Sequence, residues 1–141
     1  MKTRLVYSDY NKDTGISTVI INSKYGQFTG VSELNPEDKN YESSFLGCSI
    51  AEKRATIKAL RAQLREVKAM QKAIKIVIND LEKSKFYQKN SVENRRLRKT
   101  FWLYQKEIDK INNQITMLKM SIIKDPENRI KILKNLKHFS N

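Results

Sequence analysis

The apolar positions of the chain follow two different spacings, which divide it into an N-terminal third and a helical remainder. Up to about Leu34, short segments rich in β-branched and aromatic residues alternate with residues typical of turns. From Ile57 onward, apolar residues recur in alternating steps of three and four, the spacing of a helix with one apolar face. We therefore expect an α+β protein.

The N-terminal third is predicted to be a three-stranded antiparallel β-meander. Its turns are expected at Asn11–Gly15 and Tyr25–Gly26, because these residues tolerate tight turns and positive φ angles. Three strands are marginal by themselves, so the sheet is expected to lie against a helix. Gly30 indicates either a β-bulge or the close approach of another backbone, and a bulge is expected. The predicted strands are Arg4–Tyr7, Ile16–Ile21 and Gln27–Val31.

Two runs of heptad-spaced apolar residues predict a long antiparallel helical hairpin of coiled-coil type. They are similar in length, and a short polar segment near 87–94 separates them. With Ser91 at the centre of the turn, Gln71, the one polar residue of the first run, is expected to face Ile111. A parallel coiled-coil dimer is the alternative architecture. The apolar residues are Ile57, Leu60, Leu64, Val67, Ile74, Ile78 and Leu81, then Leu97, Phe101, Tyr104, Ile108, Ile111, Ile115, Leu118 and Ile122.

Two proline-containing segments predict where helices start and end. Asn35–Asp38 supplies a cap, a proline and acids suited to a helix start, so a short helix is expected from Asp38 to Phe45, with a bend at Gly47. Asp125–Glu127 repeats the pattern and is expected to end the second long helix. The expected organisation is a β-meander at 1–36, the hairpin at 37–124 with its tip near 87–94, and a short amphipathic helix at 125–141, all in one folding unit.

The charge of the chain favours an anionic partner. The 141 residues contain 28 Lys and Arg against 15 Asp and Glu, giving a net charge of +13 and an isoelectric point near 9.9. Such a surface attracts polyanions. The alternative is that the charge only keeps a coiled coil soluble.

Seven cations of the first predicted helix step by four and three, which forms a basic stripe beside the apolar seam. Like charges along one face repel one another unless a partner or the chain's own acids neutralise them. The alternative is a solvated face whose long side chains shield the seam. The predicted anionic-partner residues are Arg54, Lys58, Arg61, Arg65, Lys68, Lys72 and Lys75.

The tip of the hairpin is a second predicted binding site, because basic residues gather there around aromatic ones. This combination suits phosphate contact with base stacking, or a protein interface. Equally, the aromatic residues could cap the hairpin core against water. The predicted tip residues are Lys85, Phe86, Tyr87, Lys89, Arg95, Arg96, Arg98, Lys99 and Trp102.

The residues that carry catalysis or hold metals are sparse. Cys48 is the only cysteine and His138 the only histidine, and neither a phosphate-binding loop nor a zinc motif is present. A two-metal site would need scattered acids such as Asp9, Asp13 and Glu33. We therefore expect a protein that is not an enzyme, with no catalytic residues, metal or cofactor. No segment has the length and hydrophobicity of a membrane span, and Met1–Leu5 lacks the apolar core of a signal peptide.

Several short segments resemble small accessory proteins of bacteriophages and mobile elements in Gram-positive bacteria. The resemblance covers about the first 60 residues and transfers no functional residue. It implies a context rich in proteins that bind host machinery, including anti-defence proteins such as inhibitors of CRISPR nucleases. Because the sequence shows neither a signal core nor a membrane span, we expect a cytoplasmic protein, here of a bacterial host cell. The segments are Tyr25–Gly30, Leu34–Asp38, Gly47 and Ile50–Ala55.

The leading functional hypothesis is a non-catalytic basic module that engages nucleic acid or a nucleoprotein, such as a Cas nuclease with its guide RNA. The first alternative is a protein-interaction module whose hairpin docks on an acidic host protein through Trp102, Leu103 and Phe86. The second is a phage structural component that self-associates. The pattern allows a monomer or a homodimer and predicts no membrane partner.

Overall fold

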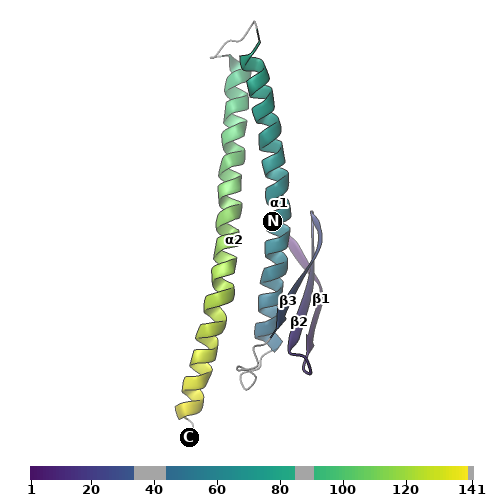
Figure 1. Cartoon of the computed structure of the whole chain (residues 1–141), viewed down its shortest axis with the longest axis vertical. Coiled ribbons are helices and arrows are strands. Elements are labelled where there is room, and N and C mark those ends of the chain that lie inside the picture. The colour runs from purple at the N-terminus through teal and green to yellow at the C-terminus, as the bar shows by residue number, and fades with distance from the viewer. Residues whose placement is uncertain (34–43, 85–90, 140–141) are drawn as a thin grey trace. The chain divides into compact units, whose positions relative to one another are not determined.

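The computed structural model describes residues 1–33, 44–84 and 91–139, with the side chains of 44–45 and 124–139 left out. Its elements, in chain order, are β1 (Thr3–Asn11), β2 (Ile16–Ser23), β3 (Gly26–Glu33), α1 (Ser44–Glu82) and α2 (Val92–Phe139) (Figure 1). They form two compact units. The sheet unit comprises Met1–Leu60 and Ile115–Asn141, and the hairpin unit comprises Arg61–Gln114.

The sheet is the predicted antiparallel meander, with strand order β1-β2-β3. The first turn forms where the sequence predicts it, because the Asn11 side-chain oxygen accepts a hydrogen bond from the Asp13 amide at 2.9 Å. The Gly15 amide then donates to the Asn11 carbonyl at 2.8 Å. These local bonds allow β1 to continue to Asn11, past the predicted end at Tyr7.

One face of the sheet packs against α1, which confirms the expectation that the sheet lies against a helix. Alternate residues of β2 point to this face, and Val19 and Ile21 are buried there. Ala51, Ala55 and Ala59, spaced by four on α1, complete the cluster. Because alanine has the smallest apolar side chain, the helix can approach the strands closely.

The closest approach lies at Gly30, where the bulge interpretation is wrong. The pairing of β2 with β3 runs without a shift through Val19 and Gly30. A Cβ atom at Gly30 would lie 2.7 Å from the Ala55 nitrogen and even nearer to the Ala51 carbonyl oxygen. Gly30 is therefore required because helix backbone occupies the space where a side chain would be. The irregularity of the sheet lies in β1, between Leu5 and Tyr7.

The start of α1 differs from the expectation of a bend at Gly47. The helix begins at Ser44 and includes Gly47, whose missing side chain leaves room for the Ser17 side chain of β2. Close contact with the sheet, not a change of direction, explains this glycine. The predicted cap at Asn35–Asp38 and most of the predicted short helix lie outside the described residues.

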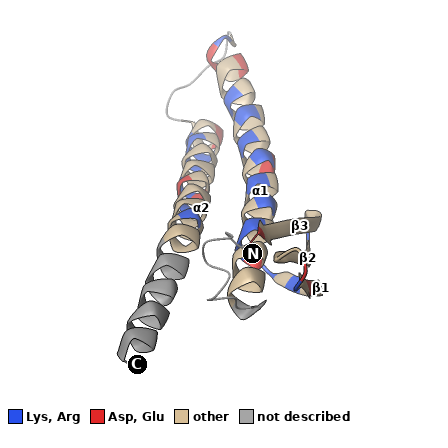
Figure 2. Ribbon diagram, turned by 60° about the horizontal axis from the view of Figure 1, so that its bottom comes forward, with Lys and Arg blue, Asp and Glu red and all other residues tan. Residues whose placement is uncertain are grey.

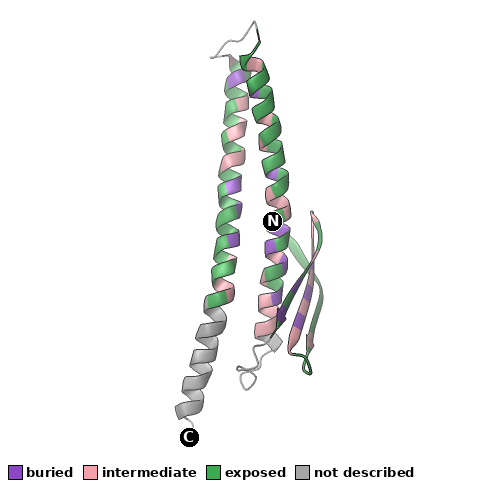
Figure 3. Ribbon diagram, in the orientation of Figure 1, coloured by how far each residue is buried: buried purple, intermediate pink, exposed green. Residues whose placement is uncertain are grey.

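The hairpin unit confirms two long helices that pack through the predicted apolar seam. Val67 and Ile78 of α1 are buried, as are Ile108 and Ile111 of α2 (Figure 3). Between these positions, exposed residues occupy most of each helix surface. The stability of this unit therefore rests on a narrow line of aliphatic contacts, each worth about 1.5–3 kcal/mol before ordering entropy is subtracted.

The predicted register of the seam is wrong, because Ser91 caps a helix and does not sit at the centre of the turn. Its hydroxyl accepts a hydrogen bond from the Asn94 amide at 3.2 Å, so α2 begins at Val92. The link between the helices is centred nearer the N-terminus than Ser91. Gln71 consequently donates to Gln105 at 2.9 Å instead of facing Ile111.

The predicted end of the second helix at Asp125–Glu127 is also wrong. The backbone of α2 remains helical through Pro126 to Phe139, so no separate short helix follows at 125–141. A proline inside a helix removes one N–H donor and crowds the carbonyl four residues earlier. The energetic cost is about 3 kcal/mol. The helix continues because the residues on either side of Pro126 favour helix by more than this cost. None of the described helices combines the length and hydrophobicity needed to cross a membrane.

Replacing Gly30 with alanine tests the close approach. We expect Gly30→Ala to lower the free energy of unfolding by about 3 kcal/mol or more, because a methyl group forces the strand away from α1. Thr29→Ala is the control, since the Thr29 side chain is exposed on the same strand, and should change stability by less than about 1 kcal/mol. Chemical denaturation followed by circular dichroism measures both. Equal stability of the two variants would contradict the contact.

Candidate anionic-partner interface

All seven residues of the predicted basic stripe lie on α1, but they belong to different units. Arg54 and Lys58 are in the sheet unit, and the five residues from Arg61 to Lys75 are in the hairpin unit. Lys and Arg recur along α1 in both (Figure 2). The seven are all exposed. Their contacts separate them into two groups.

Arg54 and Lys58 bind the backbone of β3. The Arg54 guanidinium donates to the Val31 carbonyl, and the Lys58 ammonium donates to the Thr29 carbonyl, both at 2.6 Å. Val31 and Thr29 are two residues apart, so their carbonyls point to the same side of the strand. These two cations therefore cover the outer edge of β3. The periodicity of the sequence does not predict this role.

The other five cations are turned to solvent. Among the described residues, no hydrogen bond or ion pair engages Arg61, Arg65, Lys68 or Lys72. Lys75 lies 5.7 Å from the centre of the Phe101 ring, a cation–π distance. We name Arg61, Arg65, Lys68, Lys72 and Lys75 the α1 cationic face.

The charge around the α1 cationic face is strongly unbalanced. From Arg61 to Lys75 the sequence contains five cations and one acid, Glu66, for a net charge of +4. The whole hairpin unit, Arg61–Gln114, holds fourteen Lys and Arg against six Asp and Glu, a net charge of +8. Successive cations are spaced by about 5 Å along the helix axis, at 1.5 Å per residue. The face is thus a regular row of positive charge with few acids of its own.

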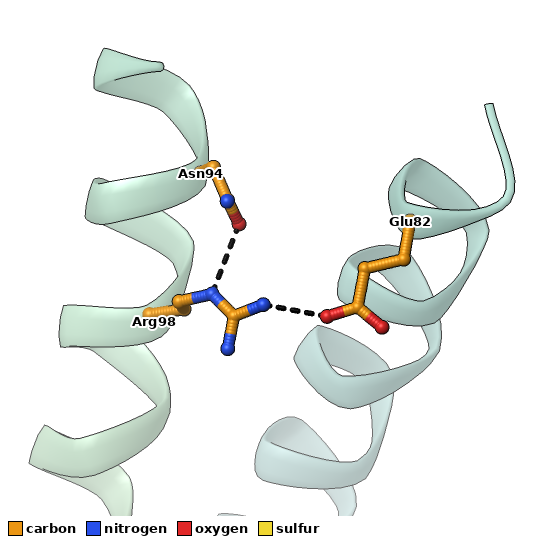
Figure 4. A network of polar contacts seen from close by, with 3 residues as sticks. All are labelled: Glu82, Asn94 and Arg98. Atoms are coloured by element: carbon orange, nitrogen blue, oxygen red, sulfur yellow. Dashed lines mark hydrogen bonds and ion pairs between the residues drawn. The ribbon is translucent and has the colours of Figure 1, made fainter. Parts of the chain in front are cut away.

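At the predicted tip, Arg98 has a structural role. Its guanidinium donates to Glu82 of α1 at 2.5 Å and to the side-chain oxygen of Asn94 at 3.2 Å (Figure 4). Asn94 is buried. Together these groups tie the end of α1 to the start of α2. The sequence contains one hint of where α2 begins, since serine is among the residues favoured at the N-cap of a helix, but it contains no signal for the contacts of Arg98.

Of the remaining predicted tip residues, some have exposed side chains and others lie outside the described residues. Arg95, Arg96 and Lys99 are exposed on the first turns of α2, and no described partner holds them. The other predicted tip residues lie outside the described part of the chain, and their role stays a prediction. They are Lys85, Phe86, Tyr87 and Lys89.

Trp102 does not cap the hairpin core. It is 63% exposed, and the adjacent Leu103 is 54% exposed. The neighbouring Phe101 ring meets the Trp102 ring edge to face, with 5.9 Å between ring centres, and Phe101 is the half-buried seam residue. Tryptophan is one of the residues that most often contribute large binding energies at protein interfaces.

The described residues contain no cluster of three or more His, Cys, Asp or Glu side chains able to hold a metal ion. No protein-family model, curated protein or solved structure matches the chain. The contacts and charges of the chain itself are therefore the basis on which a function can be proposed.

A double-mutant cycle tests the structural role of Arg98. We expect Arg98→Ala and Glu82→Ala to be coupled by about 0.5–1 kcal/mol in the free energy of unfolding, as is typical of an exposed ion pair. Arg95→Ala serves as the control, because its exposed side chain should change stability by no more than about 0.5 kcal/mol. The coupling should weaken in high salt. Additive effects of the two single substitutions would show that the pair contributes nothing.

Proposed function

We propose that this protein is a non-catalytic module that binds the phosphate backbone of a nucleic acid along the α1 cationic face. The observation that supports the proposal is the solvent-facing state of this row, with four of its five members unpaired among the described residues. Phosphate groups neutralise such charges and release the counterions that surround the nucleic acid. A partner therefore relieves repulsion within the row and gains entropy as well.

The contrast with Arg54 and Lys58 argues against a merely solvated face. Those two cations satisfy carbonyl groups of β3 at 2.6 Å. The five that follow keep the same spacing along the helix, and no comparable acceptor binds them among the described residues. A helix that only needed solubility could carry acids and bases in alternation, which stabilises it through pairs four residues apart. Between Arg61 and Lys75, Glu66 is the one acid.

The proposal extends to a class of natural partner. The resemblance of the N-terminal segments to phage accessory proteins suggests a nucleoprotein, such as a Cas nuclease loaded with guide RNA. In such a complex the cationic face would lie on exposed nucleic acid and would hinder access to it. This binding needs no catalytic group.

Salt dependence tests the proposal. With five phosphate contacts, log affinity for duplex DNA should fall against log salt with a slope near −4.5, and for a single strand near −3.5. Replacing two cations, as Lys68→Gln/Lys72→Gln, should reduce the duplex slope by about 1.8. Fluorescence anisotropy of a labelled duplex and a labelled single strand across a range of KCl concentrations measures this.

The matched control is Lys106→Gln/Lys110→Gln on α2. It removes two lysines with the same spacing of four, and both are exposed in the same unit. The control should keep nearly the full salt slope. Equal losses in the two variants would mean that net charge alone matters, and affinity that does not respond to salt would exclude phosphate binding.

A second candidate function is docking on an acidic protein through Trp102 and Leu103. Their exposure favours it, because a tryptophan with most of its surface in water gains apolar burial when a partner covers it. Lys99 and Lys106 flank the pair in sequence and are exposed. Such a rim of cations suits an acidic partner.

Trp102→Ala separates the two functions. We expect duplex affinity to stay within about twofold of the unsubstituted protein, and affinity for a docked protein to fall by about thirtyfold, as for a central interface residue. Capture from nuclease-treated lysate at high salt, followed by titration of the recovered protein, measures the second effect. Met70→Ala, which removes another exposed apolar side chain of the hairpin unit, is the control. Undiminished capture by Trp102→Ala would exclude this docking mode.

A further inference from the structure

The two edges of the sheet are treated differently by the rest of the sheet unit. On β3, Arg54 and Lys58 occupy the Val31 and Thr29 carbonyls, so a further strand cannot reach them without displacing both cations. Long basic side chains are one of the means by which proteins block sheet edges. The β3 edge is thus closed.

Among the residues that the structure describes, the β1 edge is open by comparison. Every residue of β1 except Tyr10 is exposed, and α1 packs mainly on β2 and β3 (Figure 1). It also contacts β1 through a hydrogen bond of 3.4 Å from the Ser8 hydroxyl to the Cys48 sulfur, which lies on the face of the sheet and leaves the outer edge of the strand free. Three apolar residues in succession, Leu5, Val6 and Tyr7, are 54%, 46% and 49% exposed. An edge strand of nine residues with an apolar centre is a template for pairing with another strand.

We propose that β1 pairs antiparallel with β1 of a second copy of this chain, which joins two three-stranded sheets into one of six strands. The two-fold axis lies between Val6 and Tyr7. In this register Arg4 faces the partner's Asp9, and Val6 faces the partner's Tyr7. Opposite charges and a β-branched residue beside an aromatic one are both favourable cross-strand pairs.

The irregularity of β1 selects this register. Leu5 pairs with Ile21 and Tyr7 with Ile20, so Val6 is the extra residue of a bulge. The bulge shifts the alternation of side chains by one residue. Leu5 and Ser8 therefore lie on the face of the sheet that packs against α1, since they pair with Ile21 and Val19. Arg4 and Asp9 lie on the opposite face. Only an axis between Val6 and Tyr7 brings like faces together over the whole length of β1, on both sides of the bulge. An axis through Tyr7 would set Val6 against Ser8 on the opposite face.

The bulge also favours a second copy over a foreign strand. A bulge discourages pairing with a regular strand, because it twists and bends the edge. A second copy carries the same bulge at Val6. The two bulges lie next to each other at the two-fold axis, so both strands bend at the same point and can remain paired on either side of it. Since the β3 edge is closed, association stops at two chains and does not continue into a fibre.

Charge exchange at Arg4 and Asp9 tests this interface in the full chain. Arg4→Glu and Asp9→Lys each place like charges opposite one another twice per dimer, and each should weaken dimerisation at least about tenfold. The double variant Arg4→Glu/Asp9→Lys restores opposite charges and should recover most of the affinity. Sedimentation equilibrium from micromolar to millimolar protein measures the dissociation constant against the monomer mass of 16.5 kDa.

Lys12→Glu is the matched control for Arg4→Glu, and Asp13→Lys is the matched control for Asp9→Lys, because each makes the same change of net charge in the exposed turn after β1. Both should leave the dimer unchanged, and circular dichroism checks that every variant folds. A monomer at all concentrations overturns the proposal. So does a dimer that ignores the single substitutions, which would indicate another interface such as the helices, or a double variant that fails to recover. Binding of DNA is measured separately, so failure here leaves the function of the α1 cationic face unaffected.

Discussion

The sheet unit depends on the close approach of two backbones, β3 at Gly30 and α1 at Ala51 and Ala55. Because no side chain separates them, the helix lies near enough to the strands for small residues to bury the β2 side chains of this sheet face. Val19, Ile21 and the three alanines of the core are at most 1% exposed. A larger side chain on either element would open this contact, and a sheet of three strands has little other cover.

The same approach decides how the cations of α1 are used. With the helix held against β2 and β3, Arg54 and Lys58 reach around the edge of β3 and satisfy two of its carbonyls. Carbonyls at a sheet edge otherwise depend on water or on a neighbouring strand. Beyond Leu60 this part of the sheet unit ends, and in the described part of the chain the α1 cations that follow at the same spacing bind no carbonyl. The same spacing of cations along α1 thus protects a sheet edge in one unit and produces an exposed row of positive charge in the other.

In the hairpin unit, the spacing of apolar residues determines which side chains are buried, and polar contacts determine how the two helices are offset. The seam residues Ile78 and Ile108 are buried as heptad spacing predicts. The offset of one helix along the other depends instead on polar contacts. Ser91 caps the start of α2, and Gln71 donates a hydrogen bond to Gln105. A heptad repeat is satisfied equally well by several offsets. The turn could not be placed from a polar segment in which many residues suit a loop.

The order of apolar and polar residues was sufficient to predict three antiparallel strands, two long helices and the exposure of Arg61, Arg65 and Lys68, because each depends on local periodicity. Only the tertiary structure decided that Gly30 marks a close contact, that Arg54 and Lys58 close a sheet edge, and that Arg98 joins two helices. These features bring together groups far apart in the chain. Local spacing describes which face a residue occupies, but not which backbone or side chain will meet it there.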